Sequence, residues 1–251
     1  MKLKLKTNKP ITPTPALVRD EDFHSKEAYK AIRTNILHLL KESDKKTILI
    51  TSPYAGAGKT TTVANLAITF AQLGKKVLII DCDMRKPSIH KIFSLHSTPG
   101  LSSILAEDMG ADIIRETSYD NLHVLTAGTI PANPSELLHS NKFTDLLNDL
   151  SEKYDIIFID APPVDVVTDA VIISPQAAGT VLVIRQNSTE KEELLRTVQT
   201  LRKVNANILG YVLNAVDYEK FSYRYGHYTT KYSKRYSYYY YQSPEEEKES
   251  E

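Results

Sequence analysis

The chain has 251 residues, 41% hydrophobic and 25% charged, a composition that suits one globular domain of about 200 residues with polar ends. Basic and acidic residues both number 31, so net charge gives no reason to expect nucleic acid as a partner. Cys82 is the only cysteine, which excludes an intrachain disulfide, and no apolar run approaches the roughly 18 residues of a membrane span. We therefore expect a cytoplasmic protein whose membrane contact comes through a partner.

The first 24 residues predict an extended arm, since residues 10–15, PITPTP, contain three prolines. Residues 25–40, SKEAYKAIRTNILHLL, then predict an amphipathic helix capped by Ser25. Three charged residues spaced by three fall along one stripe of this helix, Glu27, Lys30 and Arg33. By itself such a stripe is typical of a solvated ion-pair face.

Short β-rich runs alternate with helical patterns beyond this helix. The strand-like runs are residues 47–51, 76–80, 122–126, 155–159, 180–184 and 208–213. Helical patterns occupy residues 61–72, 141–154 and 188–204. Near-continuous apolar strands that alternate with helices indicate a parallel sheet covered on both faces. We therefore expect a doubly wound α/β domain with a mostly parallel sheet over residues 25–216.

A glycine-rich turn, TSPYAGAGKTT, follows the first strand and opens a long helix. Glycines let such a turn curl its backbone N–H groups around a phosphate, lysine reaches the outer phosphates, and a threonine hydroxyl ligates Mg²⁺. Pro53 stands where a strict phosphate-binding loop has glycine, and an ordinary turn is the alternative; the intact GKTT between strand and helix disfavours it. The predicted nucleotide loop comprises Gly56, Ala57, Gly58, Lys59, Thr60 and Thr61.

Aspartates end two further strands, in LIIDCDMR and IIFIDAPP. The carboxyl ends of parallel strands meet at one edge of the sheet, where ligands bind in open α/β folds. Asp81, Asp83 and Asp160 are therefore expected to converge with Thr60 on a magnesium ion and its phosphates. Alone, Asp81 and Asp83 would equally suit a solvated turn.

The end of the chain, residues 217–251, is rich in tyrosine. It suits low-complexity filler, an arm that stacks on single-stranded nucleic acid, or a phosphate acceptor. An ATP site on the same chain favours the acceptor. The candidate acceptors are Tyr218, Tyr223, Tyr225, Tyr228, Tyr232, Tyr236, Tyr238, Tyr239, Tyr240 and Tyr241.

These motifs resemble those of the bacterial tyrosine kinases (BY-kinases), which serve capsule and exopolysaccharide synthesis. SPYAGAGKTT resembles their Walker A loop, LIIDCDMR their Walker A′ motif and IIFIDAP their Walker B motif. The resemblance covers roughly residues 20–241, including the tyrosine-rich tail. The family shares its P-loop NTPase fold with chromosome-partition and Min-type ATPases. Those usually carry a second lysine where this chain has Tyr54, which counts against a partition-type ATPase.

The resemblance implies roles for the site residues. Lys59 and Thr60 would bind ATP and Mg²⁺, Asp83 and Asp160 would organise the waters of the metal, and Asp81 would accept the proton of the phenol.

Two further residues have alternatives that stay open. Arg85 would steady the phosphates or an acceptor, or form a surface salt bridge. Asn214 follows the last predicted strand, where relatives often contact the nucleotide base. Alternatively, it is an ordinary turn residue at the end of a strand.

The resemblance also implies partners. The family joins subunits into a ring through Glu-x-x-Arg-x-x-Arg, here Glu27, Lys30 and Arg33, and lysine lacks arginine's bidentate fork. Firmicute members use a separate transmembrane adaptor, a polysaccharide co-polymerase, that stimulates the kinase. A stand-alone kinase at the inner face of the plasma membrane, opposed by a phosphotyrosine phosphatase, is the expected arrangement.

The expected function is an ATP-dependent protein-tyrosine kinase. It would autophosphorylate its tail in trans and regulate capsule or exopolysaccharide synthesis and export. The alternatives are a partition/Min-type ATPase switch and a non-enzymatic scaffold whose tail another kinase modifies.

Overall fold

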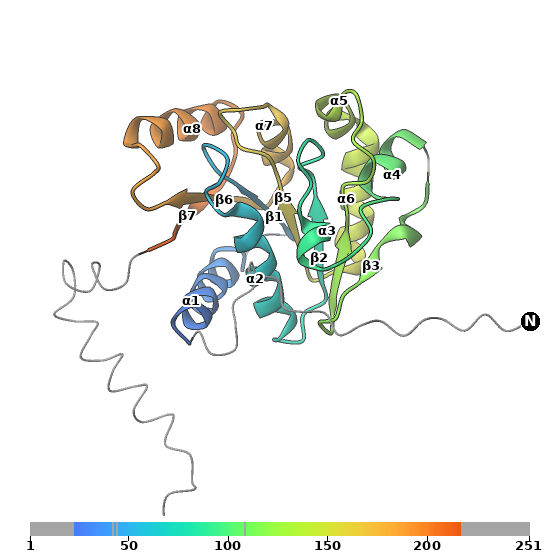
Figure 1. Ribbon diagram of the computed structural model, residues 1–251, viewed down its shortest axis with the longest axis horizontal. Helices are drawn as coiled ribbons and strands as arrows, with labels where there is room; N and C mark the ends of the chain where they lie inside the picture. Colours follow the sequence, from blue (N-terminus) through green and yellow to red (C-terminus); the bar gives the residue numbers. More distant parts are fainter. Residues whose placement is uncertain (1–22, 42, 44, 108, 217–251) are drawn as a thin grey trace, which may run out of the picture. The chain divides into compact units, whose positions relative to one another are not determined.

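The computed structural model describes residues 23–41, 43, 45–107 and 109–216 (Figure 1). The expected arm, except for its last two residues, and the tyrosine-rich tail lie outside the described residues, as do all ten candidate acceptor tyrosines.

One seven-stranded sheet has the order β3-β4-β2-β5-β1-β6-β7. Every neighbouring pair is parallel except β3 and β4. The strands are β1 (Thr47–Thr51), β2 (Val77–Asp81), β3 (Arg115–Glu116), β4 (Leu122–Leu125), β5 (Ile156–Asp160), β6 (Gly179–Arg185) and β7 (Ile208–Asn214). All six predicted strands are present, and the doubly wound, mostly parallel sheet is confirmed. The antiparallel edge strand β3 was not predicted, since two residues leave no alternation to detect.

The helices are α1 (Phe23–Leu39), α2 (Lys59–Ala71), α3 (Ile89–Ile92), α4 (Leu101–Glu107), α5 (Pro134–His139), α6 (Asn141–Lys153), α7 (Asp169–Ile173) and α8 (Lys191–Lys203), with 3₁₀ turns at Ala111–Ile113 and Ser174–Gln176. The four long helices were predicted. The other four have four to seven residues, too few to display a helical period.

The start of α1 corrects one prediction. The helix begins at Phe23, so Ser25 lies inside its first turn and is not the N-terminal cap. The rings of Phe23 and His24 meet edge to face at 5.9 Å in that turn, an apolar contact that the capping pattern did not reveal.

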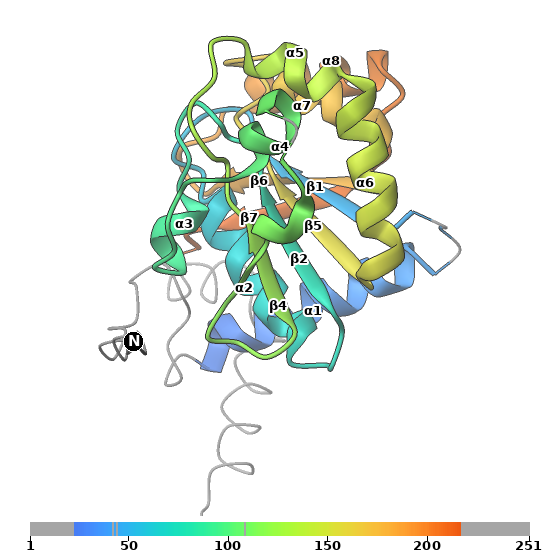
Figure 2. The same cartoon turned by 90° about the vertical axis from the view of Figure 1, so that its right-hand side faces the viewer.

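Two layers of helix cover the sheet (Figures 1 and 2). α1, α2 and α3 pack on one face and α4 to α8 on the other. Successive strand side chains point to opposite faces of the sheet. Leu49 of β1 therefore packs with α4 to α8, while Ile48 and Ile50 pack with α1 to α3. Phe70 of α2 meets Phe158 of β5 edge to face, with ring centroids 5.3 Å apart.

The strand register decides what meets at the carboxyl edge. Asp81, the last residue of β2, pairs with Asp160, the last residue of β5. β5 also pairs with β1, and Ile50 of β1 stands opposite Asp160. The turn from β1 into α2 therefore begins beside both strand-end carboxylates.

Candidate active site

The turn between β1 and α2 has a backbone that only glycine adopts without strain at two positions. Gly56 has φ 83° and Gly58 has φ 97°, both left-handed. A Cβ on Gly58 would also lie 1.9 Å from Asn214 Nδ2. Left-handed residues just before a helix turn successive N–H groups to one side, the geometry of a phosphate cradle.

Side chains from the far end of the sheet hold this turn from outside. Asn214 Nδ2 donates to the Ala57 carbonyl oxygen at 2.9 Å, and Arg185 Nη1 donates to that of Gly56 at 3.3 Å. The hydroxyls of Tyr54 and Thr189 are 2.8 Å apart. Asn214 thus contacts the phosphate loop itself, and Tyr54, at the position of the second lysine of partition-type ATPases, ties that loop to the segment after β6.

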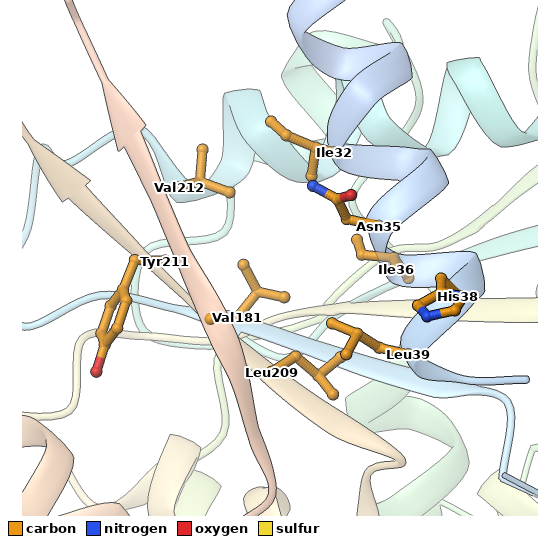
Figure 3. Close-up of a pocket in the computed structure, with 10 residues that line it drawn as sticks. Ile32, Asn35, Ile36, His38, Leu39, Val181, Leu209, Tyr211 and Val212 are labelled. Atoms are coloured by element: carbon orange, nitrogen blue, oxygen red, sulfur yellow. The ribbon is translucent and has the colours of Figure 1, made fainter. Parts of the chain in front are cut away.

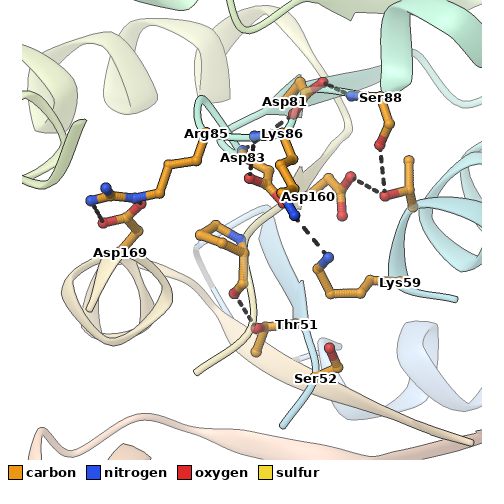
Figure 4. Close-up of polar contacts among 12 residues, drawn as sticks. Thr51, Ser52, Lys59, Asp81, Asp83, Arg85, Lys86, Ser88, Asp160 and Asp169 are labelled. Carbon is orange, nitrogen blue, oxygen red and sulfur yellow. Dashed lines mark hydrogen bonds and ion pairs between the residues drawn. The ribbon is translucent and has the colours of Figure 1, made fainter. Parts of the chain in front are cut away.

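Lys59, the first residue of α2, points its ammonium group at Asp83 (Figure 4). The Lys59 Nζ to Asp83 Oδ2 distance is 3.7 Å, and the two side chains are only 9% and 10% exposed. Asp83 Oδ1 also accepts the N–H of Lys86 at 3.0 Å. A lysine so enclosed and so loosely paired is placed to bind a phosphate in the cradle.

Thr60 and Asp160 form the second pair of the site. Thr60 Oγ1 donates to Asp160 Oδ2 at 2.7 Å, and Ser88 Oγ lies 3.2 Å from Thr60 Oγ1 (Figure 4). Asp160 Oδ1 is buried and has no hydrogen-bond partner among the described residues. Burial raises the pKa of Asp160 to about 6, although Lys59 and the Thr60 hydroxyl both lower it.

The unpartnered Asp160 oxygen tests whether a magnesium ion fits. Mg²⁺ keeps several waters and takes few protein ligands, so a hydroxyl beside a carboxylate that accepts from bound water suits it. The described part of the chain contains no group of three His, Cys, Asp or Glu side chains placed to chelate a metal. The residues therefore fit an ion held by Thr60, water and nucleotide phosphates, with the carboxylates as water acceptors.

Asp81, like Asp160, has no exposed surface, whereas Asp83 is 7% exposed. Its Oδ1 accepts the N–H of Asp83 at 3.2 Å, and its Oδ2 accepts those of Ser88 and Ile89, each at 3.1 Å. Burial and the nearby charge of Asp160 raise the pKa of Asp81 well above its ordinary value. Asp81 thus fastens the loop that carries Asp83, in addition to lying beside the other two carboxylates.

Arg85 points away from Lys59 and toward α7 (Figure 4). Its Nε lies 3.1 Å from Asp169 Oδ2, and its Nη2 donates to Asp169 Oδ1 at 3.3 Å and to Ser135 Oγ at 3.0 Å. The ion pair named as the alternative for Arg85 is thus present, and its partner is fully buried. Asp169 and Ser135 were not singled out from the sequence. An acid at the start of one short helix and a serine near the start of another resemble ordinary capping residues.

The three charged residues of the α1 stripe make two kinds of contact, one within α1 and one to α2. Lys30 Nζ lies 2.7 Å from Glu27 Oε1, and both side chains are half exposed. Arg33 instead donates from Nη1 to the Thr69 carbonyl oxygen at 2.8 Å, which ties α1 to α2 within the subunit. Glu27 and Lys30 thus form the exposed part of the stripe.

An apolar hollow of about 290 Å³ lies between α1 and the edge of the sheet (Figure 3). It is lined by Ile32, Ile36 and Leu39 of α1, Val181 of β6, and Leu209 and Val212 of β7, among others. None of the predicted nucleotide or catalytic residues lines it, although β7, which contributes to its lining, ends at Asn214. The hollow is therefore separate from the predicted chemistry.

No helix within the described residues is long and apolar enough to cross a bilayer.

The chain is similar to proteins named as tyrosine-protein kinases. The family model described as an AAA domain matches residues 45–210. The chain is 42% identical to the putative tyrosine-protein kinase CapB of Staphylococcus aureus over 88% of its own length and 97% of that protein. It is also 42% identical to the tyrosine-protein kinase YwqD of Bacillus subtilis, over 82% of this chain and 86% of that protein.

Solved structures agree with this. The kinase domain of the Escherichia coli tyrosine kinase ETK matches with a TM-score of 0.74 and 32% identity, over 76% of this chain and 75% of that chain. The chimerical protein CapA2B2 matches with a TM-score of 0.71 and 42% identity, over 74% and 83%. The septum site-determining protein MinD of Pyrococcus horikoshii, complexed with Mg-ADP, matches with a TM-score of 0.58 and 26% identity. The match covers 67% of this chain and 69% of that chain. The fold is that of nucleotide- and magnesium-binding P-loop proteins.

Proposed function

Since this chain belongs to the bacterial tyrosine-protein kinases, we propose that it phosphorylates the tyrosine cluster of its own tail between subunits. It is an ATP-dependent tyrosine-protein kinase related to capsule and exopolysaccharide kinases. The observation that carries the proposal is the junction of the phosphate loop, Lys59 and three carboxylates at the ends of adjacent strands.

We assign the nucleotide to the loop from Gly56 to Thr61. Lys59 would exchange its 3.7 Å contact with Asp83 for the outer phosphates, and Thr60 would ligate Mg²⁺. When bound, Mg²⁺ neutralises charge on the transferred phosphoryl group. Asp83 and Asp160 would accept hydrogen bonds from the waters of the metal, a role that suits the unpartnered Asp160 oxygen.

Asp81 is our candidate proton acceptor. The pKa of a free phenol is about 10, and the raised pKa of Asp81 narrows the gap between donor and acceptor. Its backbone hydrogen bonds to Ser88 and Ile89 must be released if the phenol is to reach it. Asp81→Asn tests this: a fall in phosphoryl transfer with unchanged ATP affinity supports the role, and equal activity contradicts it.

Transfer in trans is tested by mixing two inactive partners. Lys59→Met keeps the tail but lacks the lysine, and a chain truncated after Val216 keeps the site but lacks the acceptors. Neither protein alone should yield phosphotyrosine with Mg·ATP, whereas the mixture should label the full-length chain. No labelling, with both chains folded and associated, would rule out transfer between subunits.

Phosphorylation is expected to limit itself. Residues 217–251 contain six Lys/Arg and seven Asp/Glu, a net charge of −1. Each phosphotyrosine adds about −1.5 to −2, so ten would add roughly −15 to −20. Repulsion among such tails would loosen a ring-shaped homo-oligomer joined through α1. Exposed charges are already screened beyond about 8–10 Å in physiological salt, and high salt screens them more strongly. Size exclusion after Mg·ATP should therefore show looser association in low salt than in high salt.

We further propose that the kinase acts at the inner face of the plasma membrane. A separate transmembrane adaptor, of the polysaccharide co-polymerase kind, would bring the kinase there and stimulate it. A phosphotyrosine phosphatase would reverse the phosphorylation. We expect no nucleic-acid partner. The cytoplasmic segment of the adaptor, added to pure kinase, should raise the rate of autophosphorylation. Full activity that no adaptor segment changes would contradict this.

A further inference from the structure

Asp169 carries a charged contact that the proposed function does not use. It is the first residue of α7 and is fully buried. Its two oxygens accept from Nε and Nη2 of Arg85, and Oδ1 also accepts from Ser135 Oγ at 2.5 Å. A two-point contact of this kind fixes the plane of the guanidinium as well as its position. The Arg85 side chain is 40% exposed, so the pair joins the interior of α7 to the rim of the site.

Arg85 lies in the loop between β2 and α3, residues 82–88, which also carries Asp83. Two other side chains of this loop contact α2, since Asp83 lies 3.7 Å from Lys59 Nζ and Ser88 Oγ lies 3.2 Å from Thr60 Oγ1. The remaining polar contacts are local. Asp81 accepts N–H groups at both ends of it, and Asp83 accepts that of Lys86. The contact of Arg85 with Asp169 differs from these because it ties the loop to α7, which packs on the opposite face of the sheet from α2.

The segment before α7, residues 161–168, is bonded to the start of the phosphate loop. Thr51 Oγ1 donates to the Pro162 carbonyl oxygen at 2.8 Å, and the N–H of Val164 donates to the Ser52 carbonyl oxygen at 2.9 Å. A closed circuit of contacts results. It runs from β1 through this segment to Asp169, across to Arg85, along the loop to Asp83, and back through Lys59 to α2.

From this circuit we propose that Asp169 is a positioning residue which, through Arg85, fixes the β2–α3 loop and so places Asp83 opposite Lys59 and the magnesium site. A buried ion pair is by itself weak evidence of a role in stability, because the cost of desolvating the carboxylate opposes its attraction to the partner. The proposal rests on the proposed function only in assigning Asp83 to the waters of the metal.

Asp169→Asn preserves the size of the side chain and removes its charge, and Arg85→Lys preserves the charge and removes the fork. In the full-length chain, each should raise the Mg²⁺ concentration for half-maximal autophosphorylation by about 10-fold, the scale of losses at outer-shell partners of metals. The KM for ATP at saturating Mg²⁺ should change much less. The double variant should be no worse than the poorer single variant, since both break the same contact.

A matched control separates positioning from loss of stability. Thr197 of α8 is fully buried, and its Oγ1 donates to Asp165 Oδ1 at 2.9 Å, in the same segment but away from Arg85. Thr197→Val should lower the melting temperature and leave the Mg²⁺ dependence unchanged. The proposal is overturned if Thr197→Val shifts the Mg²⁺ dependence as Asp169→Asn does. It is also overturned if the effects of Asp169→Asn and Arg85→Lys simply add in the double variant.

A binding measurement keeps this test independent of kinase activity. Calorimetric titration of the full-length protein with ADP, with and without Mg²⁺, gives the contribution of the metal to nucleotide affinity. That contribution should fall by about 10-fold in Asp169→Asn and in Arg85→Lys. Unchanged contributions in both variants would refute the role of Asp169 even if the protein proves an active kinase. Absence of phosphotyrosine in the unmodified protein would instead refute the proposed function. Arg85→Lys alone decides the matter if Asp169→Asn does not fold.

Discussion

Thr60 and Asp160 are 100 residues apart in the chain, and their side chains share a hydrogen bond of 2.7 Å. One stands at the start of α2 and the other at the end of β5, so the bond joins the phosphate loop to the neighbouring strand. The second Asp160 oxygen is left buried and unpartnered among the described residues. This arrangement makes Asp160 the residue of the site whose replacement is most informative.

Asp160→Asn should lower autophosphorylation roughly 10–100-fold, because an amide accepts metal-bound water more weakly than a carboxylate. The loss should be partly recovered at high Mg²⁺, since the phosphate loop itself is unchanged. Phosphotyrosine yield against Mg²⁺ concentration measures both effects. Activity equal to the unmodified protein at every Mg²⁺ concentration would remove Asp160 from the metal site.

The free energy of unfolding should depend on pH through Asp160. Burial raises its pKa to about 6 from 3.8, so the folded state holds the proton more tightly than the unfolded chain. This stabilisation is complete below pH ~4 and is lost as pH rises through about 6, a difference of about 3 kcal/mol. The raised pKa of Asp81 acts in the same direction.

Denaturant unfolding at pH 4.5 and 7.5, without nucleotide, measures this dependence. Asp160→Asn should lose less stability than the unmodified protein over that interval, because its amide does not ionise. Parallel losses in the two proteins would show that Asp160 ionises normally in the folded state.

Gly58→Ala should abolish tight nucleotide binding and destabilise the fold by about 1–3 kcal/mol, because the new methyl meets Asn214 at a left-handed position. Gly56→Ala is the matched control. It is also left-handed but has nothing within 4 Å, so backbone strain of about 1–2 kcal/mol is its main effect. Melting temperatures and ADP titrations should rank the two variants in this order. Adding Asn214→Ala to Gly58→Ala should recover part of the stability; no recovery would mean that the contact is unimportant.

Tyr54→Phe removes only the hydroxyl that meets Thr189. The phosphate loop should be less firmly held, and ADP should dissociate about 2–10-fold faster, the effect of one lost hydrogen bond. Thr189→Val should reproduce the change, and the double variant should not exceed it. Stopped-flow release of a fluorescent nucleotide measures the rate; additive effects would show that the two hydroxyls act separately.

How far the sequence predicts this protein differs from one element to the next. Long amphipathic helices such as α2 and α6 and buried apolar strands have periods that can be read locally, and they were predicted. α5, α7 and β3 are too short to show a period, and tertiary packing decides them. The residues at those elements, Ser135 and Asp169 among them, were accordingly missed.

The phosphate loop and the strand-end acids could be predicted from the sequence, because glycine spacing and residues at the ends of apolar strands are local features. The fold class could be predicted as well, since strands that alternate with helices have few ways to bury both faces. Which side-chain atoms contact one another depends on the three-dimensional fold. The register of β2 against β5 places Asp81 beside Asp160, burial sets the pKa of each, and the approach of α7 gives Arg85 its partner. Register, burial and partner choice depend on contacts between residues far apart in the chain, which no local pattern encodes.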